Sequence, residues 1–503
     1  MTLLAELPPP QLSQPARDLL GERTAHLDGA WEEGQGEGAI AVLDPATGSA
    51  LARLAPSSTE QAERAVGAAR RAFDSGPWAG SSPRERSERL HALADLMEDH
   101  SEELSELTVA EVGCPIELTR FLQVQWPIDD VRWSAEAALR GPIGGYEQGL
   151  PPHPGPPYSS SLLRREPVGV VAAITAFNSP LTQAAWKLGP GLAAGCTFVL
   201  KPASKTPLAT IALLRLIERA GFPPGVVNLV HGDAPQARVL TTHRDVDMVM
   251  FTGSAAVGAE VMASAARALK PCVLELGGKS ATIVLPGSDL EQVTGPSVMR
   301  FLRISGQACG ATTRTLLPRS EYERYLERAR EFLATVRVGD PWDPATEVGP
   351  LIREGQRSFV EEHVAAAVAA GAVVEAGGGR PNRLDGYFVN PTIVGGVANS
   401  DPICREELFG PVGAVLPYDS VEEAVAIAND SDYGLHGAVY GPPDQCMEVA
   451  RRIRAGTVSV NGGGSHRPDG PWGGFKRSGF GREMGEDGFR EFFAVKHVQW
   501  PLR

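Results

Sequence analysis

The sequence predicts an α/β protein that contains parallel sheets, and three observations support this prediction. From residue 168, short β-rich runs alternate with helical segments, and a second alternating block runs from about 278 to 480. The chain has 503 residues, which is too long for a single hydrophobic core. Because alternation of strand and helix is typical of parallel sheets, we expect one α/β domain from each block.

The composition is that of an ordinary globular enzyme. Hydrophobic residues make up 43% of the chain and charged residues 21%, which argues against a fibrous or disordered protein. The formal net charge is −14, and no Lys/Arg block is long enough to track a phosphate backbone, so we expect no nucleic-acid partner. The N-terminal stretch resembles no signal peptide, and the longest apolar run, Val168 to Phe177, is far shorter than a membrane span. These features predict a cytoplasmic protein without a membrane partner.

The elements are expected in the following order. Residues 58–113 show helical periodicity and open with a Ser/Thr cap. The segment 145–167 is Pro-rich and then strand-like, which suits contact with another subunit better than a core. The strands predicted in the first block are VGVVAAIT, CTFVLKP, VVNLVHG and VDMVMFTGS, and those in the second are SATIVL, TTRTLLP, YFVNPTIV, GAVLPY and GTVSVN.

Six cysteines are scattered without a CxxC pair, and no His cluster has metal-ligand spacing. We therefore predict neither a disulfide framework nor a metal site. One cysteine differs from the others in its surroundings. Cys309 stands in the Gly-rich turn GQACGATTR, which exposes a thiol and leaves backbone NH groups free beside it.

Two further motifs suit chemistry at such a thiol. In LELGGKS, Glu275 ends an apolar strand, where burial raises a carboxyl pKa and favours a general base. In ITAFNSP, Asn178 follows a buried strand and offers an amide NH2 to a developing oxyanion. Taken alone, Glu275 is equally well a strand-end charge and Asn178 an ordinary turn residue.

A nucleotide site is indicated by two strand ends. Lys201 directly follows a strand in VLKPASKTP, and FTGSAAVG places Gly253, Ser254 and Gly258 at a strand-to-helix turn, where a helix N-terminus favours pyrophosphate. The spacing differs from GxGxxG. The near-match GEGAIA, residues 36–41, leads toward the turn DPATG and not toward a helix, so we interpret it as a chance match.

Taken together and in order, ITAFNSP, LKPAS, FTGS, LELGGKS, GQACGATTR, EELFGPV and GGFKRSGFGRE resemble the aldehyde dehydrogenase superfamily from about residue 25 to the C-terminus. The resemblance implies a Rossmann-like NAD(P)-binding domain (1–144 and 168–277), an α/β catalytic domain (278–481) and a small β-strand arm (145–167 and 482–503). It also implies a homodimer or homotetramer that oxidises a small-molecule aldehyde with NAD or NADP.

The resemblance assigns roles to individual residues. Cys309 would be the nucleophile that forms a thiohemiacetal and then a thioester, Glu275 the general base that activates water, and Asn178 the oxyanion donor. Lys187 and Glu483 would relay the proton onward. The implied cofactor contacts are Thr175, Ala176, Phe177, Lys201, Ser204, Gly253, Ser254, Gly258, Glu407 and Phe409, and the implied substrate contacts are Ser179, Arg303, His466 and Trp472.

The chain departs from the family pattern at two places. Ala176, Phe177 and Ser179 stand where the family more often has Pro, Trp and an aromatic residue, and the tunnel positions, with Gly463, Gly464 and Arg467 nearby, are polar. This favours a polar or anionic substrate bound by Arg303 or Arg467. Ser204 stands where many NAD-preferring members have Glu, so we expect NADP to be tolerated or preferred.

Two other classes of function remain open from the sequence. One is a dehydrogenase that passes the acyl group to coenzyme A, and the other is a catalytically silent family member with a binding role. Retention of Glu275 argues against the first, and retention of both Cys309 and Glu275 argues against the second.

Overall fold

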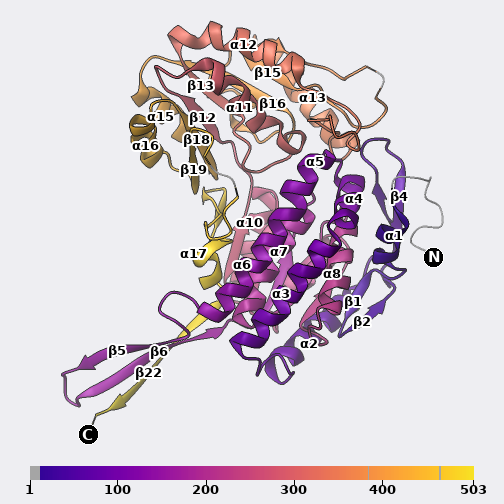
Figure 1. Cartoon of the computed structure of the whole chain (residues 1–503), viewed down its shortest axis with the longest axis vertical. Helices are drawn as coiled ribbons and strands as arrows, with labels where there is room; N and C mark the ends of the chain where they lie inside the picture. The colour runs from indigo at the N-terminus through magenta and orange to yellow at the C-terminus, as the bar shows by residue number, and fades with distance from the viewer. Residues whose placement is uncertain (1–11, 383, 464–465, 503) are drawn as a thin grey trace.

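The computed structural model describes residues 12–382, 384–463 and 466–502, and it shows two α/β lobes and a narrow projecting ribbon of strands (Figure 1). The lower lobe in this view contains the helices from the first half of the chain. The upper lobe contains the second sheet. The predicted α/β class is confirmed.

The first sheet has eight strands in the order β2-β1-β9-β8-β7-β10-β11-β21. The five central strands, β9 to β11 in this order, run parallel, and all of their residues are buried. The four strands predicted in this block are present, whereas the antiparallel edge strands are too short to have been visible as sequence patterns. In sheet order the bounds are Ala30–Glu32, Ala25–Leu27, Val227–Leu229, Thr197–Lys201, Val170–Ile174, Met248–Thr252, Cys272–Glu275 and Gly479–Phe480.

Helices cover both faces of this sheet, which explains its continuous apolar strands. In β7, Val171 and Ala173 join the core cluster of α3, α6, α7 and α8, whereas Val170 and Ala172 join the cluster on the side of α2. The helices of this lobe are α1 (Gln14–Leu20), α2 (Thr59–Asp74), α3 (Pro83–Asp99), α4 (Ser101–Val112), α5 (Ile116–Leu118), the π-helix η1 (Thr119–Gln125), α6 (Trp126–Arg140), α7 (Pro180–Ala194), α8 (Leu208–Arg219), α9 (Ala234–Thr242) and α10 (Ala255–Ala266).

The helical segment predicted over 58–113 consists of three helices, α2 to α4. Ser58 caps α2 in a capping box with Gln61, so the predicted Ser/Thr cap is confirmed. A second capping box at Ser82, followed by Pro83, starts α3.

The second sheet has seven strands in the order β14-β15-β16-β13-β12-β18-β19, all parallel except the edge strand β14. The five strands predicted here are present. In sheet order the bounds are Val373–Ala376, Thr392–Gly395, Val412–Tyr418, Arg314–Pro318, Ala281–Val284, His436–Tyr440 and Thr457–Val460. The accompanying helices are α11 (Leu290–Leu302), η2 (Arg303–Gly306), η3 (Arg319–Glu321), α12 (Tyr322–Thr335), α13 (Glu354–Ala369), α14 (Pro402–Arg405), α15 (Val421–Asn429) and α16 (Pro443–Arg452).

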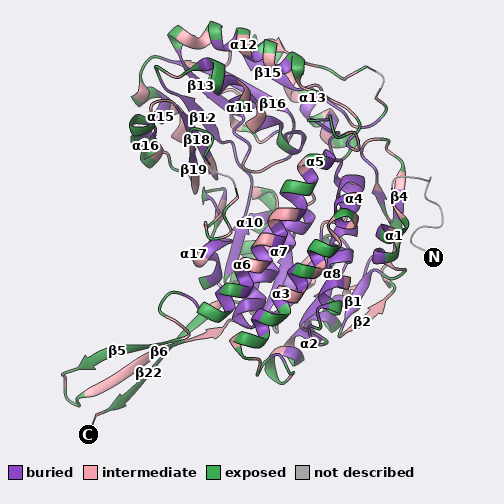
Figure 2. Ribbon diagram, viewed as in Figure 1, coloured by how far each residue is buried: buried purple, intermediate pink, exposed green. Residues whose placement is uncertain are grey.

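The projecting ribbon is a three-stranded antiparallel sheet of β5 (Glu147–His153), β6 (Ser159–Pro167) and β22 (Phe493–Pro501). Most of its residues are exposed or half-buried, as the green and pink strands of Figure 2 show. The segment predicted as the second part of the arm began at residue 482. In the structure, α17 (Gly485–Arg490) precedes the ribbon and contacts α7, so the ribbon itself begins at Phe493.

Two smaller sheets complete the fold. The GEGAIA stretch leads into β3 (Ile40–Leu43), which pairs with β4 (Ala50–Leu54) in a hairpin, so interpreting it as a chance match was correct. β17 (Tyr433–Gly434) pairs with β20 (Phe475–Lys476). Among the described residues, no helix is long and apolar enough to cross a membrane.

Candidate active site

A cavity of ≈ 350 Å³ lies where the loops that follow β7, β10 and β11 meet η2 and the turn before β13. The carboxyl ends of parallel strands are the usual location of a site in such a sheet. Eight of the predicted catalytic and substrate residues line this cavity: Asn178, Ser179, Glu275, Arg303, Cys309, His466, Trp472 and Glu483. Lys187 lies behind it, and Gly464 lies outside the described residues.

Cys309 is the most accessible cysteine of the chain. All six cysteines are free, and the other five are buried. The Cys309 Sγ donates to Glu275 Oε2 at 3.6 Å, and burial together with the Glu275 charge raises the pKa of the thiol well above its usual range. The thiol is therefore the resting form, and its proton has a nearby acceptor.

The turn that presents Cys309 has a strained backbone. Ile304 and Ser305 have φ values of 51° and 56°, in the left-handed region that side chains rarely adopt. Two hydrogen bonds hold this turn, from the Ser305 Oγ to the Gly349 carbonyl at 2.8 Å and from the Ile352 N–H to the Gln307 Oε1 at 2.9 Å. These hydrogen bonds therefore hold the turn that carries Cys309 in its strained conformation.

Glu275 is the last residue of β11, and its side chain is 2% exposed. Burial raises its pKa to about 8, and the charge of Glu483 adds to this effect. The Trp472 Nε1 donates to Oε2 at 2.8 Å and opposes the rise, whereas Oε1 has no hydrogen-bond partner among the described residues. A carboxyl group with this pKa can exchange protons near neutral pH.

Asn178 lies beside the Cys309 turn. Its Nδ2 donates to the carbonyl of Gln307 at 2.9 Å, and its Oδ1 accepts from Gln183 Nε2 at 2.9 Å. Gln123, in the π-helix η1, donates from Nε2 to the Asn178 carbonyl at 2.9 Å. The amide and the backbone of Asn178 are thus both fixed at the cavity wall.

Lys187 and Glu483 form a buried ion pair with 2.8 Å between Nζ and Oε1, and their side chains are 0% and 1% exposed. Lys187 also donates to the Thr252 Oγ1 at 2.7 Å. Glu483 pairs through its backbone with Trp472, so both residues flank Glu275. The Oε2 of Glu483 has no partner among the described residues, which leaves an acceptor beside Glu275.

The predicted cofactor residues gather at neighbouring strand ends. The Thr175 N–H donates to the Lys201 carbonyl at 3.1 Å, and the rings of Phe177 and Phe409 meet edge to face at 5.7 Å, which brings loops of both lobes together. Ser254 caps α10, Gly253 precedes this cap, and Gly258 lies in the helix. The contacts of these residues with a cofactor stay a prediction.

The chemistry of these side chains fits a dinucleotide. Lys201 is buried, which lowers its pKa to about 8, and its Nζ donates only to the Pro202 carbonyl among the described residues. Glu407 is half-buried, desolvation raises its pKa to about 7, and it accepts from the Gly278 N–H at 3.0 Å. A Cβ on Gly277 would lie 2.1 Å from Glu407 Oε2, so only glycine permits this approach.

Trp126 and Trp186 line the cavity and were not predicted. The predicted residue His466 donates from Nε2 to Asp130 Oδ1 at 2.7 Å and stacks on Trp126 with 4.6 Å between the ring centroids, and Trp186 Nε1 donates to the other Asp130 oxygen at 2.8 Å. Trp126 follows a π-helix, an irregularity that periodicity does not reveal. Gln183 could have been noticed as a large polar residue near the start of the mainly apolar helix α7.

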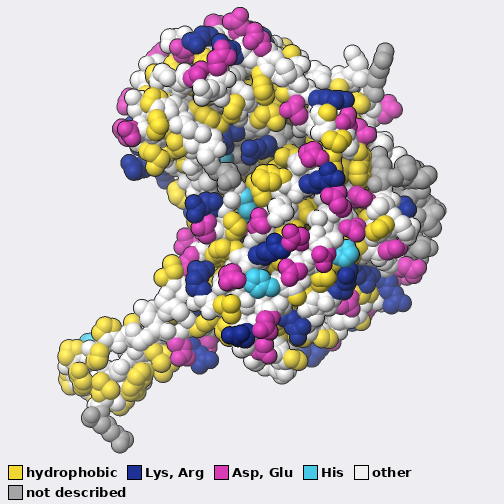
Figure 3. Space-filling model, in the orientation of Figure 1, with side chains coloured by type: hydrophobic (Ala, Val, Ile, Leu, Met, Phe, Trp, Pro, Cys, Tyr) yellow, Lys and Arg dark blue, Asp and Glu magenta, His cyan; other side chains and the backbone are white. Residues whose placement is uncertain are grey.

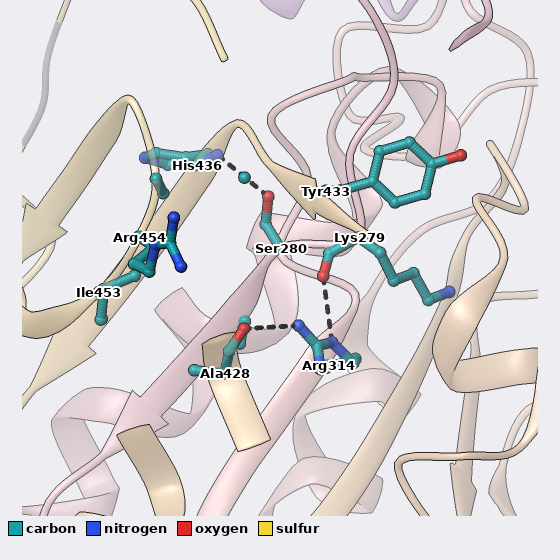
Figure 4. Close-up of a pocket in the computed structure, with 11 residues that line it drawn as sticks. Lys279, Ser280, Arg314, Ala428, Tyr433, His436, Ile453 and Arg454 are labelled. Carbon is teal, nitrogen blue, oxygen red and sulfur yellow. Dashed lines mark hydrogen bonds between the residues drawn. The ribbon is translucent and has the colours of Figure 1, made fainter. Parts of the chain in front are cut away.

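His436 lines both the main cavity and a small second one, and Figure 4 shows the second. One ring nitrogen bonds the Gly310 carbonyl at 2.8 Å and the other bonds Ser459 Oγ at 3.0 Å. Burial lowers the pKa of His436 to about 4, so the ring is neutral and donates to Gly310. Figure 4 also shows the buried Arg314 held by the carbonyls of Lys279 and Ala428.

A thiol, a carboxyl group and an amide that converge in one cavity, next to a nucleotide-type strand edge, define an enzyme of covalent oxidoreductase type. Residues 31–498 match the model of the aldehyde dehydrogenase family. The chain therefore belongs to the aldehyde dehydrogenase family, and its activity is oxidation of an aldehyde with hydride transfer to NAD(P)+.

Relatives and solved structures agree over nearly the whole chain. The betaine aldehyde dehydrogenase of Bacillus subtilis (strain 168) is 38% identical over 95% of this chain and 97% of the relative. The 3-succinoylsemialdehyde-pyridine dehydrogenase of a Pseudomonas species is 38% identical, with 95% and 98% covered. A mutant of aldehyde dehydrogenase C from Pseudomonas syringae, in complex with NAD+ and octanal, is similar with a TM-score of 0.89 at 38% identity, with 95% and 96% covered.

Proposed function

We propose that Cys309 is the nucleophile, Glu275 the general base and Asn178 the oxyanion donor of this aldehyde oxidation. The observation that carries the proposal is the 3.6 Å contact between the Cys309 Sγ and the Glu275 Oε2 in a cavity that the Asn178 amide also lines. All three side chains face the space that an aldehyde must enter.

The first half of the reaction forms a thioester. Glu275 takes the thiol proton, the sulfur attacks the aldehyde carbon, and the carbonyl electrons move to an oxygen that Asn178 and a backbone N–H stabilise. A bound nicotinamide supplies the hydride acceptor. As the C–H bond breaks, the oxygen re-forms its double bond and Cys309 carries the acyl group.

The second half releases the acid. The thiol proton on Glu275 first passes toward Glu483, whose Oε2 has no partner among the described residues and whose Oε1 pairs with Lys187 at 2.8 Å. Glu275 then takes a proton from water, the hydroxide adds to the thioester carbon, and the C–S bond breaks to release the acid and a thiolate, which takes the proton back from Glu275. Glu275 also distinguishes this enzyme from one that passes the acyl group to coenzyme A.

The test is an aldehyde panel with NAD or NADP, followed by absorbance of the reduced cofactor. Activity is expected to disappear in Cys309→Ala, and Glu275→Gln, which can neither accept the thiol proton nor activate water, should slow both thioester formation and acid release. Addition of coenzyme A should not change the product, which should remain the free acid. Turnover that survives Cys309→Ala, or an acyl-coenzyme A product, would refute the proposal.

We further propose that the substrate carries an anionic group, which Arg303 binds. Arg467 is already engaged by Asp469 through two bonds of 2.9 and 2.7 Å. Arg303 lines the cavity and has no hydrogen bond or ion pair among the described residues. Trp126 and Trp186 supply an apolar wall for the rest of the substrate.

The matched substrates are octanal and 8-oxooctanoate. Arg303→Met is expected to lower kcat/KM for the acid about tenfold or more, since a charge-assisted bond contributes about 1.5–3 kcal/mol, and to leave octanal within about twofold. An equal effect on both aldehydes would mean that Arg303 does not bind the substrate anion. The Pseudomonas relative named for a semialdehyde and the complex with octanal make this pair the natural comparison.

We also propose that both NAD and NADP are accepted. Ser204 places no charge of its own beside the ribose position, but its Oγ donates to Asp233 Oδ1 at 2.5 Å, which brings one carboxylate close. Lys205 lies over the Phe177 ring at 5.4 Å and supplies a nearby cation. Asp233→Asn is expected to raise kcat/KM for NADP and not for NAD; an unchanged ratio would contradict this role.

We propose that the ribbon joins subunits into a homodimer or homotetramer. We also propose that the protein is located in the cytoplasm. Tyr158, Val495, Val498 and Trp500 expose apolar surface on it, visible as the yellow arm of Figure 3. Free cysteines, one of them catalytic, suit a reducing compartment. Light scattering of the wild type and a Trp500→Glu/Val495→Glu variant tests the assembly, and cell fractionation tests the location.

A further inference from the structure

A chain of three hydrogen bonds connects two amide side chains behind the oxyanion site. The Ala176 N–H donates to Gln183 Oε1 at 2.6 Å, Gln183 Nε2 donates to Asn178 Oδ1 at 2.9 Å, and Asn178 Nδ2 donates to the Gln307 carbonyl at 2.9 Å. Gln307 stands two residues before Cys309. The chain therefore runs from the loop after β7 to the nucleophile turn.

The two ends of this chain fix its direction. A backbone N–H can only donate and a backbone carbonyl can only accept, so neither end can be reversed. A flipped Gln183 would place its NH2 against the Ala176 N–H, and a flipped Asn178 would place its oxygen against the Gln307 carbonyl. Each amide thus has one satisfied orientation.

This direction decides what Asn178 offers to the substrate. One N–H of Nδ2 goes to Gln307, and no described residue accepts from the other, while Asn178 lines the cavity. The second N–H is therefore available to a developing oxyanion. With the reverse orientation, the Asn178 oxygen would face that oxyanion and repel it.

We propose that Gln183 is a positioning residue that orients the Asn178 amide as an oxyanion donor. Gln183 is 5% exposed, and a buried amide is costly unless its polar atoms are bonded, as they are here. This proposal rests on the role given to Asn178 above and adds a residue that acts through it. Gln123 holds the Asn178 backbone, whereas Gln183 fixes the direction of its side chain.

Two substitutions separate this role from a merely structural one. Gln183→Glu keeps an acceptor for the Ala176 N–H, but a carboxylate cannot donate to the Asn178 oxygen. The Asn178 NH2 therefore turns toward this carboxylate and away from the cavity. Gln183→Met loses both bonds and leaves the Asn178 amide free to take either orientation. A positioning role makes Glu the more damaging variant, and a purely structural role makes Met the more damaging one.

The measurement is the single-turnover rate of cofactor reduction at pH 8, alongside KM and the dissociation constant of the cofactor. Loss of one oxyanion donor typically costs about 100- to 1,000-fold in rate, so we expect about 100-fold for Gln183→Glu and about tenfold for Gln183→Met, with the cofactor dissociation constant unchanged. In an Asn178→Ala background, Gln183→Glu should have no further effect. The matched control Gln61→Met removes a buried amide on α2, remote from the cavity, and should lower thermal stability without changing this rate.

The outcomes are distinguishable. If Met is more damaging than Glu, or if the effects of Asn178→Ala and Gln183→Glu multiply, Gln183 does not act through Asn178 and the inference is wrong. If Asn178→Ala itself leaves the rate unchanged, the assignment of Asn178 fails, and this inference fails with it.

Discussion

Removing the indole N–H of Trp472 should weaken Glu275 as a base at neutral pH. This N–H donates to Glu275 Oε2 at 2.8 Å and is the strongest of the interactions that lower the pKa of Glu275, which burial has raised to about 8. A hydrogen bond to a charged group contributes about 1.5–3 kcal/mol, and 1.36 kcal/mol corresponds to one pH unit. Trp472→Phe should therefore move the acidic limb of the kcat profile up by about one to two pH units.

The direction of this shift follows from the protonation state in which Glu275 acts as a base. The base form of Glu275 is the carboxylate, so activity rises with pH through the pKa, and a higher pKa means less activity below it. At pH 7 the loss is about 10- to 100-fold where thioester hydrolysis limits turnover, and it recovers near pH 10.

The assay is kcat from pH 6 to 10 with saturating aldehyde and cofactor. Trp186→Phe is the matched control, because Trp186 lines the same cavity but donates to Asp130 and not to Glu275. An acidic limb that stays in place in Trp472→Phe, or that moves equally in Trp186→Phe, would refute the reasoning.

Three other variants follow from the same electrostatics. Lys187→Met leaves Glu483 buried and unpaired and should cost about 3–5 kcal/mol in chemical denaturation, and a loss below about 1 kcal/mol would contradict this. Glu483→Gln removes the second cause of the raised Glu275 pKa, so the acidic limb should move to lower pH, opposite to Trp472→Phe; a shift to higher pH would contradict it. His436→Ala removes the donor to the Gly310 carbonyl and should lower kcat about tenfold. The pH profile of kcat should neither gain nor lose a limb between pH 6 and 9, because the His436 pKa of about 4 keeps the ring neutral there. His436→Gln keeps a donor and should lose less activity.

Much of the fold could be predicted because its central strands carry their own signal. β7, β8, β10 and β12 are continuous apolar runs followed by turn residues, and such runs identify buried parallel strands. The antiparallel strands β1, β2 and β21 have two or three residues each, and they are strands only because a neighbour offers unpaired backbone groups. Local sequence does not contain that information.

The same distinction holds in the site. Cys309, Glu275 and Asn178 stand in motifs whose residue types already suit their proposed chemistry, and the structure brings all three to one cavity. Gln183 and Trp126 stand in no motif. Their importance depends on which groups they meet after folding, and this was not readable from spacing.

A long-range contact adds to one expectation. Ser204 predicts tolerance of NADP because many NAD-preferring members have Glu at this position. Asp233, 29 residues further along the chain, accepts from the Ser204 hydroxyl and brings a carboxylate beside it. The predicted tolerance of NADP therefore depends on Asp233 as well as on Ser204.

The resting site pairs a neutral thiol with a carboxyl group that can exchange protons near neutral pH. Burial raises the pKa values of both Cys309 and Glu275, and the charge of Glu275 raises that of Cys309 further. Only one proton has to move across the 3.6 Å contact to create the attacking sulfur, and it moves between partners of similar environment. A permanently ionised thiolate would instead require a cation beside it, and the buried cation Lys187 is already held by Glu483 and Thr252. In the proposed mechanism, activation of Cys309 is therefore left to Glu275, which serves a second time when water attacks the thioester.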